Sequence, residues 1–96
     1  MTVDPDAVVE ATLACADVAA MSSGVLGEAA SYLPGRRVAG VRETDDELEV
    51  HVVARWGRPL PLVATTVRAA VAPIVPGKPV AVFIDDVELP DAARVP

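Results

Sequence analysis

LEVHVVARW at residues 48–56 is the clearest strand in the sequence. Apolar and mainly polar side chains alternate along it with a period of two, which places one set on each face of a strand. We expect one set to face a core, and Gly57 to end the strand. The inward set is Leu48, Val50, Val52, Ala54 and Trp56, and the outward set is Glu49, His51, Val53 and Arg55.

The segments on either side of this strand predict a hairpin and a helix. Residues 38–43 have the character of an antiparallel partner, joined to residues 48–56 by a polar connection at residues 44–46. Residues 59–74 begin with two prolines and then show apolar side chains at spacings of three and four, the pattern of a helix with one buried face. Pro73 predicts that this helix kinks or stops in its last turn.

A second strand follows the helix. Residues 80–84, VAVFI, form a continuous apolar run, which is typical of a strand buried on both faces or nearly so. Because a helix returns the chain across the sheet, we expect this strand to run parallel to residues 48–56. Asp85 and Asp86 interrupt the alternation and predict a bulge.

The amino-terminal part of the chain is less regular. Residues 5 to about 16 predict a helix, with acidic side chains near its start. Residues 17–21 are compatible with either a continuation of this helix or a short strand. Residues 27–40 are the least regular segment, with a turn at residues 33–35 and one helical turn at residues 28–32.

These elements define the expected fold class, which is α+β. We expect one domain over residues 1–96, with an ordered core at about residues 5–89 and a frayed tail from Pro90. The predicted order is helix, optional short strand, two hairpin strands, helix and strand. We expect these elements to form a small mixed β-sheet of three or four strands with two helices on one face.

Composition limits the functions that this domain can have. The chain has 96 residues and a formal net charge of −6, which disfavours broad attraction to nucleic acid or anionic lipid. The longest uncharged run, residues 18–27, is about half the length of a membrane helix, so direct insertion is not expected. The acidic start lacks the features of a secretory signal, and the single cysteine fits a reducing cytoplasm.

No motif in the sequence points to catalysis or to a bound metal. His51 is the only histidine, and we interpret it as solvated or structural because no motif places a nucleophile beside it. Cys15 lies among small apolar residues, where an unreactive thiol is expected. The acidic clusters at residues 45–47 and 85–88 lack the spacing of a calcium loop and predict solvated charge. We therefore expect no enzyme activity, no cofactor and no metal.

Two short features are compatible with binding. Gly24-Val25-Leu26-Gly27 matches the Gly-x-x-Gly loop by which one class of small α+β domain clamps a nucleic-acid backbone. That loop depends on positive charge, whereas this one holds Val and Leu in an acidic chain. Arg36 and Arg37, with Arg42 nearby, form the most concentrated basic patch, which binds a phosphate or a partner carboxylate, or else pairs with the acids of this chain.

The apolar run at residues 80–84 points to a partner surface. If its alternate residues face the helices, then Ala81 and Phe83 look outward, and Val53 joins them on the same face of the sheet. Burying a Phe contributes about 1.5 to 3 kcal/mol, so a cover is expected. The cover is either another protein or a second copy of this chain, or else residues 27–40 fold over the face.

Several of these stretches together resemble the bacterial alkaline-shock, envelope-stress-response family. The resemblance extends over residues 7–90. The matching stretches are YLPGRRV at residues 32–38, Gly40-Val41, VHVVARWG at residues 50–57, VRAAV at residues 67–71, and residues 82–89 with Asp86-Val87. Members often carry a Val-Pro-Gly-Val turn after the first helix, where this chain has Ala16-Asp17-Val18.

The resemblance implies a non-enzymatic cytoplasmic protein that serves cell-envelope homeostasis, is recruited to the membrane through a partner and self-assembles. Our first hypothesis is thus an interaction or scaffold module of this family. Its candidate partner surface comprises Val53, Ala81 and Phe83, together with Arg36 and Arg37. The alternative is a small nucleic-acid-binding domain that uses the Gly24–Gly27 loop.

Overall fold

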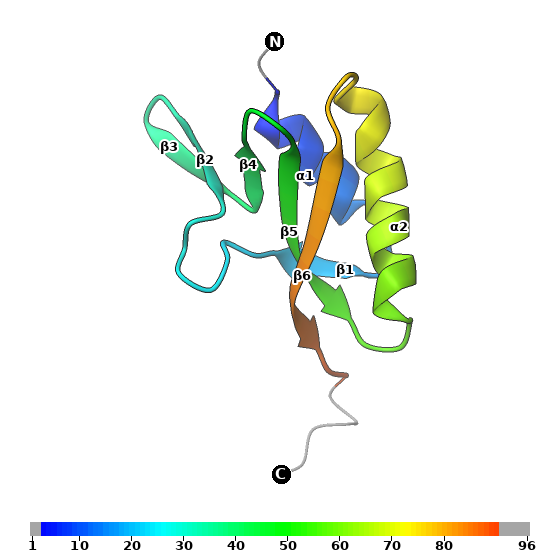
Figure 1. Ribbon diagram of the computed structural model, residues 1–96. Helices are drawn as coiled ribbons and strands as arrows, with labels where there is room; N and C mark the ends of the chain where they lie inside the picture. The colour runs from blue at the N-terminus through cyan, green and yellow to red at the C-terminus, as the bar shows by residue number, and fades with distance from the viewer. Residues whose placement is uncertain (1–2, 91–96) are drawn as a thin grey trace.

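β5 (Leu48–Arg55) is the central strand in the computed structural model, which describes residues 3–90 (Figure 1). Its side chains alternate as predicted, and Leu48, Val50, Val52 and Ala54 are buried. The inward position expected for Trp56 is wrong. The strand ends at Arg55, so Trp56 already belongs to the turn that follows, and its side chain is 65% exposed.

β6 (Val80–Glu88) runs parallel along one edge of β5, as predicted. The pairing begins at Leu48 opposite Val80 and shifts between Val52 and Val53, where the register passes over Asp85. This confirms the predicted bulge. The strand is longer than the apolar run that predicted it, because pairing with β5 continues beyond the bulge.

Two short strands share the other edge of β5, and both are antiparallel to it. β4 (Val41–Glu43) pairs with residues 48–50, and β1 (Val18–Met21) pairs with residues 52–54. Residues 18–21 therefore form a strand and do not extend the first helix, which decides between the two alternatives left open above.

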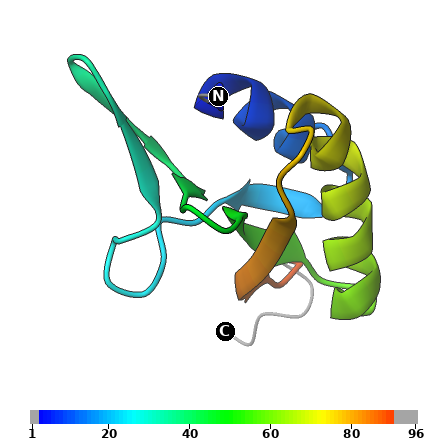
Figure 2. The same ribbon diagram turned by 45° about the horizontal axis from the view of Figure 1, so that its top comes forward.

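Both helices pack on the same face of this sheet (Figures 1 and 2). α1 (Pro5–Leu13) is capped by the Asp4 carboxylate, which accepts a hydrogen bond from the Asp6 amide at 3.0 Å. It ends before residue 16 because the chain turns there into β1. α2 (Leu60–Val71) continues into a 3₁₀ turn, η1 (Ala72–Ile74), so the predicted change at Pro73 is confirmed.

The helices and the sheet enclose one aliphatic core, which confirms the predicted α+β class and the two helices on one face. Branched side chains suit this layer because they pack closely against a pleated sheet. The core residues are Val8, Val18, Val41, Leu48, Val50, Val52, Ala54, Val63, Val67, Val71, Val75 and Val80.

A separate two-stranded hairpin extends away from the sheet (Figure 2). It consists of β2 (Ala30–Leu33) and β3 (Arg36–Ala39), joined by the turn that the sequence predicted at Pro34-Gly35. The helical turn expected at residues 28–32 is wrong, because those residues lead into β2. The antiparallel partner expected at residues 38–43 is confirmed for β4 alone, because the segment divides into β3 and β4 at Gly40.

Gly40 is the pivot at which the hairpin leaves the sheet. Its φ of +90° lies in the region that favours glycine, and its amide donates to the Ala29 carbonyl at 2.8 Å. Its carbonyl accepts from the His51 amide, also at 2.8 Å. A side chain here would place its Cβ 2.7 Å from Cε of Met21 and 3.0 Å from the His51 carbonyl oxygen.

Candidate functional site

The open face is the face of the sheet that lies opposite the helices. It presents Ala81 beside Glu49 and Phe83 beside His51, with Val53 next along β5. The structure thus brings together Val53, Ala81 and Phe83, as the sequence predicted. The Phe83 side chain remains 40% exposed, so a strand buried on both faces is wrong for the chain alone. Residues 27–40 do not enclose this ring, because it stays partly exposed, and their hairpin extends away from the sheet (Figure 2).

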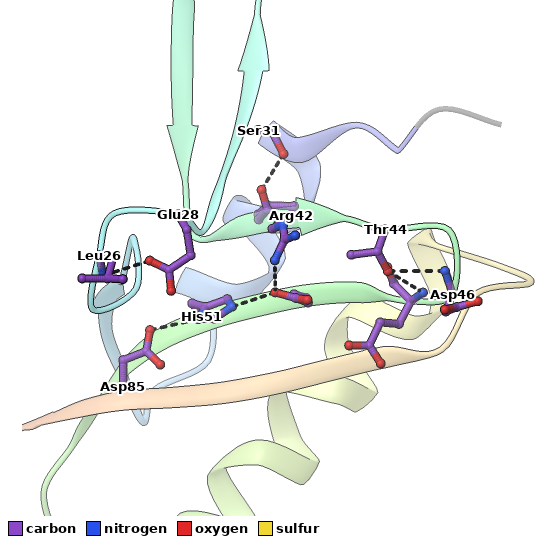
Figure 3. A network of polar contacts seen from close by, with 11 residues as sticks. Leu26, Glu28, Ser31, Arg42, Thr44, Asp46, His51 and Asp85 are labelled. Atoms are coloured by element: carbon purple, nitrogen blue, oxygen red, sulfur yellow. Dashed lines mark hydrogen bonds and ion pairs between the residues drawn. The ribbon is translucent and has the colours of Figure 1, made fainter.

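His51 anchors a polar cluster on the open face (Figure 3). Its Nδ1 lies 2.9 Å from Oδ2 of Asp85, and its Nε2 lies 3.1 Å from Oε1 of Glu49. The imidazole also stacks on the Phe83 ring, with centroids 4.5 Å apart and an angle of 6° between the planes. His51 is only 7% exposed, so the solvated interpretation is wrong and the structural one fits.

Asp85, at the bulge in β6, supplies one of the two carboxylates of this cluster. Asp85 follows Phe83 by two residues, so both side chains lie on the open face, and the Asp85 carboxylate reaches the His51 ring. The expectation that residues 85–88 carry only solvated charge is therefore wrong for Asp85. Alternation from Phe83 already places Asp85 on the open face, but its contact with His51 depends on the register with β5, which a single sequence does not provide.

The chemistry of the cluster favours a structural role. Two carboxylates of this chain engage the two ring nitrogens of His51. Neither nitrogen is then left to accept a proton from a substrate. Among residues 3–90, no group of three or more His, Cys, Asp and Glu side chains is arranged to hold a metal ion. Burial, followed by the charge of Asp17, raises the pKa of the Cys15 thiol, which disfavours the reactive thiolate.

The two arginines of the candidate surface lie on the hairpin and bind this chain. Arg36 makes a two-point contact with Asp6 of α1, with Nη1 3.0 Å from Oδ1. Because α1 covers the helical face of the sheet, Arg36 does not belong to the open face. Arg37 donates to the carbonyl of Gly27 at 2.8 Å. Arg36 is therefore held against α1, and Arg37 is held against the Gly24–Gly27 loop.

The Arg36 contact predicts a pH dependence of the hairpin. The hydrogen bond from Arg36, followed by its charge, lowers the pKa of the Asp6 carboxyl from its ordinary value of 3.8. The contribution of the pair to stability is thus present above pH 3.8 and is lost as the pH falls through the lowered value. NMR titration should find that Arg36→Gln returns the pKa of Asp6 toward 3.8. An unchanged pKa in Arg36→Gln would show that the contact does not form in solution.

The Gly24–Gly27 loop does not have the features of a phosphate clamp. Both glycines have positive φ, as a tight loop requires, but the Leu26 amide donates to the carboxylate of Glu28 at 2.9 Å. An acidic side chain thus occupies a backbone donor that a phosphate would need. Val25 and Leu26 point outward and are 89% and 88% exposed. This geometry argues against the nucleic-acid alternative.

Comparisons with known proteins add no constraint on the family or the activity. The chain matches no family model, no curated protein and no solved structure. Membership of the alkaline-shock family therefore stays a prediction. No helix among the described residues combines the length and the apolar character that crossing a membrane requires.

Proposed function

We propose that the protein is a non-enzymatic interaction module that binds another protein through the open face. The observation that carries this proposal is the Phe83 ring, which is 40% exposed and yet stacked on a His51 ring that two carboxylates hold in place. An aromatic side chain that is fixed before binding loses little conformational entropy when a partner covers it. Such side chains dominate the binding energy of many interfaces.

The surroundings of Phe83 also suit a protein partner. Apolar side chains, Val53 and Ala81, share the face with it, while Arg42 lies 3.5 Å from Glu49 on the neighbouring strand. An apolar centre beside charged groups of both signs is the usual composition of a protein interface. The partner is either a different protein or a second copy of this chain.

The cellular role that we propose follows the resemblance to the alkaline-shock family. The module acts in the cytoplasm in the response to envelope stress and reaches the membrane through a membrane-anchored partner. The acidic net charge of −6 supports an indirect attachment, because anionic lipid repels such a chain.

Phe83→Glu tests the proposal. We expect the variant to remain folded and to lose the partner, because a carboxylate in an apolar interface is desolvated without compensation. Ile74→Glu is the matched control, since Ile74 has a similar exposure of 44% but lies in η1 on the helical side. Tagged versions of the chain and both variants would be used for affinity capture from the native cell, and light scattering would give their mass.

The expected result is a defined partner, or a dimer, that is present in the unmodified chain and in Ile74→Glu and is absent in Phe83→Glu. Thermal unfolding followed by circular dichroism confirms that both variants are folded. Equal binding by the two variants would refute the assignment of the surface. Salt-dependent binding to single-stranded RNA, lost when Val25 and Leu26 are replaced, would favour the nucleic-acid alternative instead.

A further inference from the structure

A groove lies at the carboxyl ends of the parallel strands β5 and β6, where the chain turns into α2. Its volume is about 400 Å³, within the range of sites that hold a small ligand or an anchoring side chain. Trp56, Pro59, Leu60 and Val87 supply an apolar lining. The open-face cluster around His51 and Phe83 contributes no residue to it.

Trp56 forms one wall of this groove and also lines a second hollow of about 170 Å³. Its indole is 65% exposed, which is unusual for the largest apolar side chain. Leu60, on the opposite wall, is 40% exposed. A ligand that fills the groove therefore covers a large area of aromatic and aliphatic surface.

The lining of the groove includes cations and no anion, although the chain as a whole is acidic. Two of its lining residues, Arg55 and Arg58, are cations with side chains that are 54% and 51% exposed, and none of its lining residues is an anion. The first turn of α2, which begins here, also lacks an acidic side chain. In a chain with a net charge of −6, this is a local site for a carboxylate.

Internal ion pairs neutralise the two arginines only in part. Arg55 lies 3.7 Å from a Glu88 oxygen, and Arg58 lies 3.1 Å from Oδ2 of Asp17. Both pairs are at the surface, where such contacts are weak and where a guanidinium has further donors to offer.

We infer that this groove binds a short acidic segment of a partner protein, with one large apolar side chain of that segment inserted beside Trp56. The apolar lining and the exposed indole select the inserted side chain, and the two guanidinium groups select carboxylates on either side of it. The groove shares no residue with the candidate surface of Val53, Ala81 and Phe83, so the inference does not depend on the proposed function.

Trp56 gives a direct measurement, because it is the only tryptophan in the chain. The probe is the peptide Ac-Asp-Asp-Phe-Asp-Asp-NH2, titrated into the full chain at low salt. We expect its insertion to shift the tryptophan emission to shorter wavelength, with a dissociation constant on the order of 0.1 mM. Replacing every Asp of the peptide by Asn, or its Phe by Ala, should weaken binding about tenfold or more.

Variants of the protein distinguish the groove from a general attraction. Arg58→Gln should weaken binding about fivefold, whereas Arg37→Gln, which removes an arginine of the hairpin, and Phe83→Glu should leave it unchanged. Circular dichroism would verify that each variant is folded. No emission shift, or equal affinity for the Asp and Asn peptides, would overturn the inference. Binding of octanoate as tight as that of the peptide would overturn the peptide assignment in favour of a free amphiphilic carboxylate.

Discussion

Gly40→Ala should lower the free energy of unfolding by about 3 to 5 kcal/mol, a large share of the total for a small domain. Two effects add. The backbone at φ +90° is strained for any residue with a Cβ, and that Cβ would approach Met21 and the His51 carbonyl to 3.0 Å or less. Neither contact yields easily, because one atom is main chain and Met21 belongs to β1. Urea denaturation followed by circular dichroism measures the loss.

Gly35→Ala is the matched control for this prediction. Gly35 has a similar φ of +76°, but a Cβ added there meets nothing within 4 Å. It should therefore show the backbone effect alone, about 1 kcal/mol. The difference between the two variants isolates the close approach at the pivot. Equal losses in the two variants would mean that the approach at Gly40 is relieved at no cost.

His51→Ala should lower the free energy of unfolding by about 2 to 4 kcal/mol. The change removes the imidazole that contacts both Glu49 and Asp85, whose side chains are 14% and 17% exposed, and leaves these two carboxylates without that partner. It also removes the ring on which Phe83 stacks.

A double-mutant cycle tests the cause of that loss. Replacing His51 and Asp85 together should cost less than the sum of the two single changes, because the double variant leaves no unpaired acid at the bulge. Asp86→Ala, one residue away at an exposed position, should change stability by less than about 0.5 kcal/mol. Strict additivity of the His51 and Asp85 losses would show that the contact carries no coupling energy.

The sequence was sufficient to predict the elements with long periodic patterns. β5, α2 and β6 each extend over eight residues or more, and their alternation or helical spacing was readable without the rest of the chain. The β2–β3 hairpin was missed because each strand has only four residues, too few to establish a period. The break at Gly40 was missed because it depends on contacts with Met21 and His51.

The sequence predicted the part of the candidate site that depends on a periodic pattern, and it missed the part that depends on contacts between distant segments. Alternation alone placed Phe83, Ala81 and Val53 on one face. The contact between His51 and Asp85 depends on the register of two strands that are far apart in sequence, and the contact of Arg36 with Asp6 depends on how the hairpin meets α1. Trp56 was placed inward because the alternation continues formally past the last residue of the strand.

The connectivity of β5 has a consequence for synthesis of the protein. Its partner strands β1 and β4 precede it in the sequence, and its third partner, β6, follows it. β6 is the last of the described strands and completes one entire edge of β5. Until residues 80–88 have left the ribosome, the nascent chain therefore carries an unpaired edge of β5. Its core is also incomplete, since Val80 is part of that core. Folding is thus completed only after translation of the whole sheet, and until then the edge of β5 is a point at which a chaperone that binds nascent chains would protect the chain from aggregation.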